Sequence, residues 1–470
     1  MADDRLEADY VILGAGATGM AFADQLLTDT DASMILIDRR AKPGGHWNDA
    51  YSFVRLHGPS LSYGVNSREL GSGQIDKVGV NAGLHELATG PEICAYFDSV
   101  LRQRLLPCGR VAFLAMHDYA NGIATHQLTG ARTPVGFKKK LVDCTNAQTK
   151  IPATHAPPFS VADGVRCVAL GELVEIKEPV EGFTIIGAGK TAMDAVVWLR
   201  EQGVAADRIA WVRPREPWIL NRRFVQPSFE CFEDTIGCLA REFEIAMEAA
   251  SIEDLLLRLE AETIVFRIDQ NLTPTMYHCP IVSEAELAHL RSVKRVIRQG
   301  HVQRIEPDRI VSELGETATT ANTVHVHCAT AGIPRLPARP VFQGDRIDVQ
   351  YVRRCSPTFS AAVIAHLEAA LASDEEKNAA AMPVPIPDTP LDWLRERLQD
   401  AENQRAWQKI EGMVEWLAQA RLDRFAAMLN EARTNPTPEI VAIGARIQAA
   451  RKPGLTRLRA LLEEAETAVH

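Results

Sequence analysis

Residues 9–19 read Asp9-Tyr10-Val11-Ile12-Leu13-Gly14-Ala15-Gly16-Ala17-Thr18-Gly19, a short apolar run of β-favouring residues that ends in a glycine turn. The residues that follow, through Leu27, have the apolar spacing of an amphipathic helix. A second apolar run, Met34-Ile35-Leu36-Ile37, then ends in Asp38. A strand, a glycine turn, a helix and a second strand in this order predict a βαβ unit that binds a dinucleotide.

Each position of this glycine turn has a physical role. Gly14 allows the tight turn, Gly16 lets a pyrophosphate approach the backbone, and Gly19 lets the helix pack on the strand. The free amides and the positive dipole end of the helix then hold the pyrophosphate. Asp38 lies 19 residues after Gly19, where an acid accepts the two hydroxyls of an adenosine ribose, and Arg39 beside it is also expected to bind the cofactor.

The same pattern returns about 170 residues later. The run Phe183-Thr184-Ile185-Ile186 is followed by Gly187-Ala188-Gly189-Lys190-Thr191-Ala192 and by a helical stretch through Leu199. Ala192 stands where the first unit has its third glycine, and alanine is an accepted variant there. We therefore expect a second dinucleotide site, formed by Gly187, Gly189, Lys190 and Thr191.

The two units differ at the end of their second strands. The second unit has Ile209-Ala210-Trp211-Val212, which ends in Arg213, and Arg215 follows two residues later. Arginine binds the 2′-phosphate of NADP, whereas an acid such as Asp38 would repel it. The difference predicts FAD in the first unit and NADPH in the second, with hydride passing from NADPH to the flavin. The alternative is that both arginines only solvate a strand end.

The order of elements predicts an α/β protein with two Rossmann-like dinucleotide-binding domains and a C-terminal helical appendage. We expect the FAD-binding domain at residues 1–175 and 325–378, and the NAD(P)H-binding domain at 176–324. Four prolines between 383 and 390 predict a stiff linker. The C-terminal helical region is expected at 388–470, with one helical pattern from Leu391 to Ala432.

The composition excludes several classes of function. The chain has 470 residues, of which 46% are hydrophobic and 24% charged, as in an ordinary globular protein. Its 51 basic and 61 acidic residues give a net charge of −10, which argues against a nucleic-acid partner. No apolar stretch reaches bilayer length, and the acidic start does not resemble a signal peptide. These features predict a soluble, cytoplasmic protein without a membrane span.

Three further patterns carry expectations that the structure can test. The nine cysteines form no CxxC pair, so we expect a reducing compartment and no disulfide scaffold. His325 and His327 alternate onto one face of a strand, but no second pair lies nearby, so no metal site is expected. The stretch Asn221-Arg222-Arg223-Phe224 is expected to be a solvated basic turn.

Several stretches resemble the class B flavin monooxygenases, which include the flavin-containing and the Baeyer–Villiger monooxygenases. Gly44-Gly45-His46-Trp47 is similar to the GG-x-W that follows their FAD fingerprint, and residues 212–218 are similar to their Q-R-T-P-x-W. Residues 141–147 and 328–332 resemble degraded copies of their two D-x4-A-T-G strands. The Baeyer–Villiger pattern Y-x3-R-x-D-x2-S-x2-Y is matched, with histidine in place of aspartate, by Tyr51, Arg55, His57, Ser60 and Tyr63.

The resemblance implies an FAD-containing, NADPH-dependent monooxygenase that oxygenates a small organic substrate with molecular oxygen, through a C4a-(hydro)peroxyflavin. Gly45, His46 and Trp47 would then bind the cofactor. Arg55 would orient or stabilise negative oxygen, and His57 would set the protonation state, so both are candidate catalytic residues. The alternatives are a packing histidine and a surface or ion-paired arginine.

Two departures from the family pattern keep other functions open. Residues 158–173 lack the histidine of the family's F-x-G-x3-H-x3-W/Y, and His57 replaces an aspartate or asparagine. The first alternative is an NAD(P)H-dependent flavin oxidoreductase or oxidase without oxygen insertion. The second is a flavoprotein whose C-terminal helices bind a partner. These helices could also form a lid or the surface of a homodimer.

Overall fold

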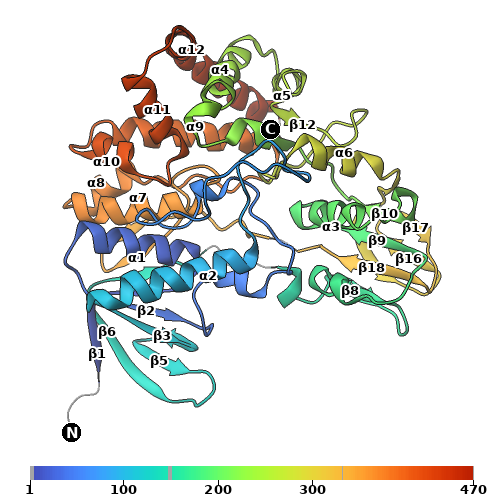
Figure 1. The fold of residues 1–470 in the computed structure, drawn as a ribbon, viewed down its shortest axis with the longest axis horizontal. Coiled ribbons are helices and arrows are strands. Elements are labelled where there is room, and N and C mark those ends of the chain that lie inside the picture. The colour runs from blue at the N-terminus through green and yellow to red at the C-terminus, as the bar shows by residue number, and fades with distance from the viewer. Residues whose placement is uncertain (1–4, 147–150, 331, 469–470) are drawn as a thin grey trace.

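The computed structural model describes residues 5–146, 151–330 and 332–468 (Figure 1). A first sheet with its helices lies at the lower left of Figure 1, a second sheet with its helices lies at the right, and a helical part lies above them. This arrangement confirms the expected fold class, with two Rossmann-like α/β parts and helices from the C-terminal region.

The first sheet has the strand order β19-β20-β6-β1-β2-β3, in which β20, β6, β1, β2 and β3 run parallel. Ile12 and Leu36 face a cluster with the helices α1, α2 and α7, while Val11 and Ile35 face the hairpin β4–β5. Both faces are buried, which is why these strands are apolar throughout. The elements of this part are β1 (Leu6–Leu13), α1 (Ala17–Asp29), β2 (Met34–Asp38), α2 (Gly90–Val100), β3 (Val111–Ala115), β4 (His117–Ala120), β5 (Ile123–His126), β6 (Arg132–Asp143), β19 (Phe342–Gln343), β20 (Arg346–Asp348), α7 (Pro357–Ala370) and α8 (Asp374–Ala380).

The second sheet has the order β14-β10-β9-β18-β8, and all its strands are parallel. Helices α3 and α6 cover one face, and a small sheet of β7 and β15–β17 covers the other. The elements are β7 (Ser160–Val161), β8 (Cys167–Ala169), β9 (Gly182–Ile186), α3 (Lys190–Glu201), β10 (Ile209–Val212), α6 (Glu284–Ser292), β14 (Arg295–Ile297), β15 (Val302–Ile305), β16 (Arg309–Ser312), β17 (Gly315–Ala318) and β18 (Thr323–His327).

The helical part is built from two segments that are far apart in the sequence. Helices α4 and α5 are inserted in the second α/β part, between strands that form a three-stranded sheet, and they pack with the C-terminal helices. In Figure 1, α4 and α5 lie beside α12 at the top. The elements are β11 (Ile219–Asn221), α4 (Cys238–Glu248), α5 (Ile252–Ala261), β12 (Val265–Phe266), β13 (Ile281–Val282), α9 (Pro390–Trp407), α10 (Met413–Gln419), α11 (Arg424–Thr434) and α12 (Pro438–Ala468).

The expected helical pattern from Leu391 to Ala432 is three helices instead of one. Gly412, at φ +74°, separates α9 from α10, and this left-handed conformation favours glycine. Asp423 begins α11, because its carboxylate accepts the backbone N–H of Phe425 at 3.1 Å. Gly412 and Asp423 therefore divide into separate helices a stretch whose apolar spacing alone predicts one continuous helix.

Residues 381–389, which we call the strap, are extended, as the four prolines predict. The strap is hydrogen-bonded to other parts of the chain. The backbone N–H of Val384 donates to the Tyr351 carbonyl at 2.7 Å, and the Asp388 carbonyl accepts from the N–H of Tyr277 at 2.7 Å. The C-terminal helices are consequently joined to the rest of the chain at several points.

Strand pairing divides the chain differently from the expected domain limits at two places. β18 begins at Thr323 and pairs with β9 and β8 in the second sheet, and β7 and β8 also belong to the second part. We therefore propose that the NAD(P)H-binding domain begins near residue 159 and ends near residue 330. Ala147 and Ala331, in the two stretches similar to the D-x4-A-T-G strands, lie outside the described residues. Across the described ranges, no helix is both long and apolar enough to cross a membrane.

Candidate cofactor-binding site

The first glycine turn forms a cradle at the start of α1. Gly14 has φ +90°, and a Cβ on Gly19 would lie 1.8 Å from the carbonyl oxygen of Gly14. Only glycine fits at position 19, since no side chain could be accommodated without moving the turn. Gly16 begins α1 and offers no side-chain cap to the helix, so its first amides face outward without a side-chain acceptor.

The segment Gly44–Trp47 packs directly on this cradle. The N–H of Gly44 donates to the Ala15 carbonyl at 2.9 Å, and a Cβ on Gly45 would lie only 3.0 Å from the Cα of Gly16. The two glycine-rich segments thus approach backbone to backbone and line one narrow site.

Trp47 and His46, which follow Gly45 in the chain, form an aromatic wall beside the first cradle. The indole N–H of Trp47 donates to the Tyr63 hydroxyl at 2.8 Å, and His46 stacks on Trp47 with ring centroids 5.2 Å apart. Burial, followed by the charge of Arg40, lowers the pKa of His46 to about 4, so this imidazole is neutral at pH 7. The structure therefore brings together all the glycine and aromatic residues expected at the first site.

Asp38 ends β2 inside the cradle and is only 5% exposed. One carboxylate oxygen accepts the N–H of Ala15 at 2.6 Å, and the other accepts the N–H of Arg40 at 2.7 Å. A carboxylate oxygen can accept two hydrogen bonds, so each oxygen keeps capacity for a ribose hydroxyl. Arg39, in contrast, points to the surface, where its side chain is 69% exposed and lies 3.8 Å from Asp118.

The second glycine turn has the same construction at the start of α3. Gly187 has φ +133°, and a Cβ there would lie 2.9 Å from the Cys328 carbonyl. Gly189 begins α3 without a side-chain cap, and a Cβ on it would meet no atom within 4 Å. The glycine turn therefore leaves open space in front of the N-terminus of α3. Thr191 is the second residue of that helix.

Lys190 does not point toward this open space but links the two α/β parts. Its ammonium forms an ion pair with Asp194, and the other oxygen of Asp194 accepts the Tyr51 hydroxyl at 2.5 Å. Burial raises the pKa of Tyr51 well above its usual value, and the charge of Asp194 adds to this effect. Tyr51 comes from the segment after the first cradle, so this three-residue contact fixes the two cradles relative to each other.

Arg213 lies next to the second cradle but is buried, with 2% exposure. It stacks over Trp211, whose indole N–H donates to the Gly187 carbonyl at 2.7 Å. Its Nη1 lies 3.2 Å from Glu216, yet neither Nη1 nor Nε has a hydrogen-bond partner among the described residues. Burial lowers the pKa of Arg213 to about 10, so the guanidinium remains charged at neutral pH.

Arg215, the other arginine expected at this site, is occupied elsewhere. It pairs with Asp388 of the strap at 2.7 Å and donates to the Thr275 carbonyl at 2.5 Å. Arg298, at the end of β14, lies closer to Arg213, because both pair with Glu216; the Arg298–Glu216 distance is 2.7 Å. Arg298 is a residue that sequence reasoning missed.

The candidate catalytic residues lie between the two cradles. Arg55 is exposed and lines a cavity of about 240 Å³ together with Lys190 and Asp194. His57 is half-buried, and burial together with the positive charges of Lys190 and Arg222 lowers its pKa to about 3. His57 is therefore a neutral imidazole at physiological pH.

Arg222 overturns the expected solvated basic turn, because it is completely buried. Its guanidinium donates to the carbonyls of His57 at 2.8 Å and Ile281 at 3.2 Å, and to the side chain of Asn81 at 3.1 Å. It also pairs with Glu286 at 2.7 Å. Neighbouring Arg223 does face solvent and pairs with Asp234. Only three-dimensional contacts distinguish these two adjacent arginines.

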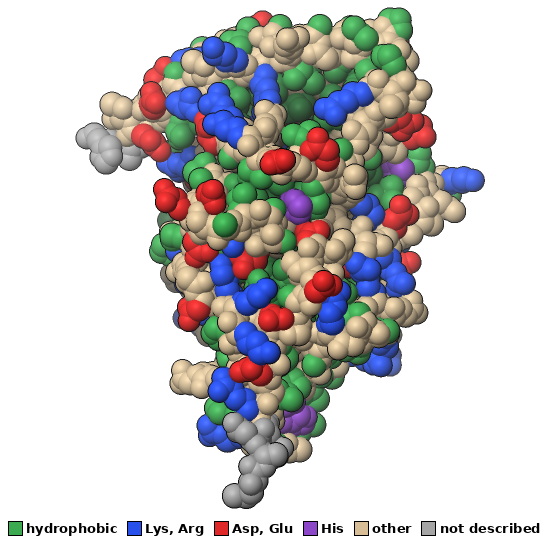
Figure 2. Space-filling view, turned by 90° about the vertical axis from the view of Figure 1, so that its left-hand side faces the viewer, with side chains coloured by type: hydrophobic (Ala, Val, Ile, Leu, Met, Phe, Trp, Pro, Cys, Tyr) green, Lys and Arg blue, Asp and Glu red, His purple; other side chains and the backbone are tan. Residues whose placement is uncertain are grey.

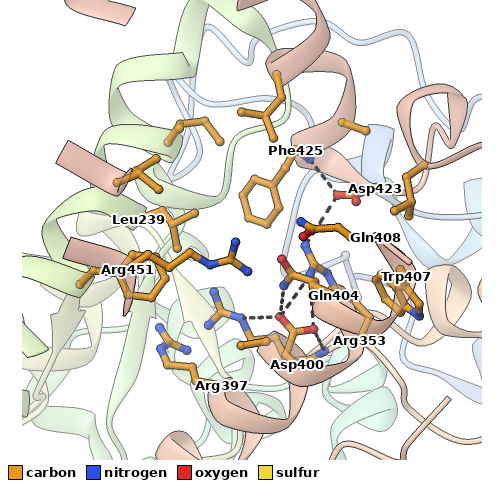
Figure 3. A pocket seen from close by; sticks show the side chains of 18 of the residues that line it. Leu239, Arg353, Arg397, Asp400, Gln404, Trp407, Gln408, Asp423, Phe425 and Arg451 are labelled. Carbon is orange, nitrogen blue, oxygen red and sulfur yellow. Dashed lines mark hydrogen bonds and ion pairs between the residues drawn. The ribbon is translucent and has the colours of Figure 1, made fainter. Parts of the chain in front are cut away.

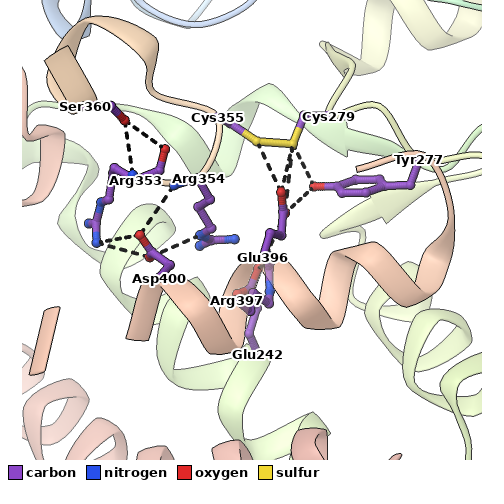
Figure 4. The surroundings of a disulfide bond; sticks show 10 residues. All are labelled: Glu242, Tyr277, Cys279, Arg353, Arg354, Cys355, Ser360, Glu396, Arg397 and Asp400. Atoms are coloured by element: carbon purple, nitrogen blue, oxygen red, sulfur yellow. Dashed lines mark hydrogen bonds and ion pairs between the residues drawn. A yellow bond between two sulfur atoms is a disulfide. The ribbon is translucent and has the colours of Figure 1, made fainter. Parts of the chain in front are cut away.

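The structure contains a disulfide between Cys279 and Cys355, which the cysteine spacing did not predict (Figure 4). Seventy-six residues separate the two cysteines along the chain, so no local motif marks the pair. Glu396 lies beside the sulfurs and accepts a hydrogen bond from Tyr277 at 3.2 Å. Burial raises the pKa of Glu396 to about 8. The other cysteines of the described residues are free.

Comparison with known proteins gives mycobacterial relatives that match most of the chain. The uncharacterized protein Rv2000 of Mycobacterium tuberculosis and the uncharacterized protein Mb2023 of Mycobacterium bovis are each 43% identical to this chain over 427 residues. The match covers 90% of this chain and 79% of each relative. The chain belongs to the same protein family as these mycobacterial proteins. Residues 12–71 of this family member also match the model of an NAD(P)-binding Rossmann-like domain.

Solved structures with a similar course of the chain are more distant. An open cyclohexanone monooxygenase is 14% identical, with a TM-score of 0.49, and the match covers 91% of this chain and 98% of that one. A flavin-containing monooxygenase from Stenotrophomonas maltophilia is 13% identical, with a TM-score of 0.41 and coverage of 86% and 99%.

Proposed function

We propose that this protein is an FAD-containing, NADPH-dependent monooxygenase that oxygenates a small organic substrate. The observation that carries the proposal is the pair of uncapped glycine cradles, at Gly16 and Gly189, whose two α/β parts are joined by the hydrogen bond from Tyr51 to Asp194. Two dinucleotide sites in contact are what hydride transfer from a nicotinamide to a flavin requires.

The residues present at the first cradle fit FAD. Five other helices of this protein are capped by the side chains of Thr89, Ser251, Ser283, Ser373 and Asp423, whereas α1 begins on a bare glycine. A pyrophosphate would satisfy those amides, and Asp38 would hold the ribose. Bound FAD would supply the acceptor for hydride and, once reduced, the electrons that activate dioxygen for insertion into the substrate.

The second cradle fits NADPH, because Arg213 has two buried guanidinium nitrogens without a hydrogen-bond partner among the described residues. A 2′-phosphate would accept hydrogen bonds from these nitrogens, and Arg298 lies near enough to add a second positive charge. Arg215 would contribute only after it released Asp388. Arg298 is likewise paired, with Glu216 and Asp269, so we assign the hydrogen bonds to the 2′-phosphate to Arg213 and only a charge contribution to Arg298.

Between the cradles, the neutral state of His57 bears on the class of substrate. A neutral imidazole gives up no proton to a developing oxygen anion, and an anionic oxygen attacks carbonyl carbon more readily than it oxidises a soft heteroatom. Arg55 would stabilise the negative oxygen. We propose that the substrate is a ketone or aldehyde.

A flavin oxidoreductase or oxidase without oxygen insertion is the second candidate. The observation that favours it is the exposure of Arg55, since an open pocket admits water and allows oxygen to leave as hydrogen peroxide.

One series of measurements tests both functions. The purified protein should be yellow, and NADPH should bleach it at least tenfold faster than NADH. Turnover under labelled dioxygen, with panels of ketones and sulfides, should place the label in ester products. A colourless protein that takes up no FAD would contradict the whole proposal. Hydrogen peroxide released in equal amount to the NADPH consumed, without labelled product, would favour the oxidase.

A further inference from the structure

A second cavity, of about 330 Å³, lies inside the helical part, within the size range of small-molecule sites, about 300–1,000 Å³ (Figure 3). Residues of α4, α9, α10, α11 and α12 and of the loop 353–354 line it. None of the cradle residues described above takes part. The face in Figure 2 shows a recess in the upper, helical part, with apolar side chains inside and Lys or Arg side chains at its rim.

The walls of the cavity are mainly apolar and aromatic. Leu239 of α4, Trp393 and Trp407 of α9, and Phe425 of α11 surround the space. In Figure 3, Arg451 points into the cavity, below Leu239 and Phe425. Such walls accommodate a hydrocarbon body.

Positive charge exceeds negative charge along these walls. Five arginines line the cavity, namely Arg353, Arg354, Arg397, Arg433 and Arg451, against three acids, Glu242, Asp400 and Asp423. Each acid already has an arginine partner. Asp400 pairs with Arg353 at 3.1 Å and with Arg354 at 3.8 Å, Asp423 lies 3.8 Å from Arg353, and Glu242 accepts from Arg397 at 2.6 Å.

Two of these arginines therefore have guanidinium nitrogens that no described acid fully satisfies. The Arg397 side chain is 8% exposed, and its guanidinium lies over the Trp393 ring at 3.5 Å. Its Nη1 is 3.7 Å from Glu396, but neither Nη1 nor Nε has a hydrogen-bond partner among the described residues. Arg451 is half-buried, and within the described ranges it pairs with no acid. A buried guanidinium without a full set of acceptors is costly, and a bound anion would remove that cost.

We propose that this cavity binds an amphiphilic carboxylate, with the carboxylate held by Arg451 and Arg397 and the hydrocarbon body packed between Leu239, Trp393 and Phe425. Guanidinium and carboxylate match in shape and can form two parallel hydrogen bonds. The proposal is independent of the proposed monooxygenase function, because the cavity shares no residue with the cradles.

The ligand site lies close to a contact with the flavin cradle. Arg421, on the turn between α10 and α11, donates to the carbonyls of Leu61 at 2.5 Å and Tyr63 at 2.9 Å. Tyr63 in turn accepts from Trp47 of the cradle wall. Asp423, on the same turn, and Phe425, in the first turn of α11, both line the cavity.

The test uses the full-length protein and decanoate, with 1-decanol as the uncharged probe of equal chain length. Trp393 and Trp407 line the cavity, so quenching of tryptophan fluorescence, together with calorimetry, reports binding. We expect decanoate to bind at least tenfold more tightly than decanol. Equal affinity for the two probes, or no binding of decanoate, would overturn the proposal.

Variants of the cavity wall locate the bound molecule. Arg451→Gln should weaken decanoate binding at least fivefold, and Arg451→Lys should lose less. Arg459→Gln is the matched control, because Arg459 lies on the same helix but pairs at the surface with Glu402. If Arg451→Gln fails to fold, Leu429→Trp, which fills the cavity from a position 39% exposed, should weaken binding of both probes. Unchanged decanoate affinity in Arg451→Gln, or in Leu429→Trp where Arg451→Gln does not fold, would contradict the assignment. Because no NADPH or oxygen is present, the result does not depend on flavin chemistry.

Discussion

The Tyr51 hydroxyl donates a 2.5 Å hydrogen bond to Asp194 and so joins the two nucleotide cradles. Hydrogen bonds to charged groups contribute about 1.5–3 kcal/mol. We expect Tyr51→Phe to lower the free energy of unfolding by about this amount and to slow flavin reduction by NADPH, since the cradles would lose their fixed separation. Urea unfolding and stopped-flow reduction measure the two effects.

The control for this variant is Tyr119→Phe, whose hydroxyl makes only a 3.4 Å bond to the Val135 carbonyl. That substitution should leave both quantities nearly unchanged. If Tyr51→Phe behaves like Tyr119→Phe, the contact with Asp194 does not couple the cradles.

Replacement of one glycine in each turn should separate effects on folding from effects on binding. Gly19→Ala places a methyl group 1.8 Å from the Gly14 carbonyl oxygen, so we expect a loss of at least about 2 kcal/mol in stability and little bound FAD. Gly189→Ala meets no protein atom within 4 Å, so it should fold normally and raise the KM for NADPH. Thermal unfolding, flavin absorbance and steady-state kinetics check these outcomes. Normal NADPH kinetics in Gly189→Ala would show that no phosphate lies there.

Arg213→Gln should reduce the preference for NADPH over NADH. The substitution removes the charge proposed to hold the 2′-phosphate, so kcat/KM for NADPH should fall at least about tenfold while that for NADH changes less than about threefold. Arg223→Gln, which removes an exposed arginine paired with Asp234, is the matched control. An equal loss with both coenzymes would assign Arg213 a purely structural role.

His57 should make the fold sensitive to acid. The pKa of His57 is about 3 in the folded protein, below the ordinary value of 6.5. Between these two pH values the imidazole is protonated in the unfolded chain but neutral in the folded protein. The stability due to neutral His57 is complete above pH 6.5 and is lost as the pH falls from 6.5 toward 3. Urea unfolding between pH 7.5 and 4.5 should show a shallower loss in His57→Gln than in the wild type.

The exposed His301 provides the comparison, since His301→Gln should retain the wild-type slope. The same assignment predicts no ionisation near pH 6.5 from His57 in the pH profile of kcat. A step at that pH that disappears in His57→Gln would contradict the neutral state.

The local parts of the site could be predicted from the sequence. The glycine turns, the strands that precede them and Asp38 are determined by residues within about 25 positions of one another, and the structure has them as expected. Hydrophobic periodicity and glycine chemistry act at this range.

The long-range parts could not be predicted, because their partners are distant in the sequence. Arg222 is buried through Asn81, 141 positions away, and Arg215 is held by Asp388, 173 positions away. For Arg213, the position at the end of a strand was predicted, but the burial of its side chain beside Glu216 was not. That burial depends on the pairing of β10 with β14, which is a long-range contact.

The helical part cannot be cut off as a unit. Helices α4 and α5 belong to the second α/β part of the chain and pack against α12. A protein truncated after residue 380 would therefore expose Leu255 and Trp218 to solvent, and we expect it to aggregate. A single protease nick within the strap should give two fragments that still migrate together without denaturant. A fragment chosen for expression should therefore include both α4–α5 and α9–α12.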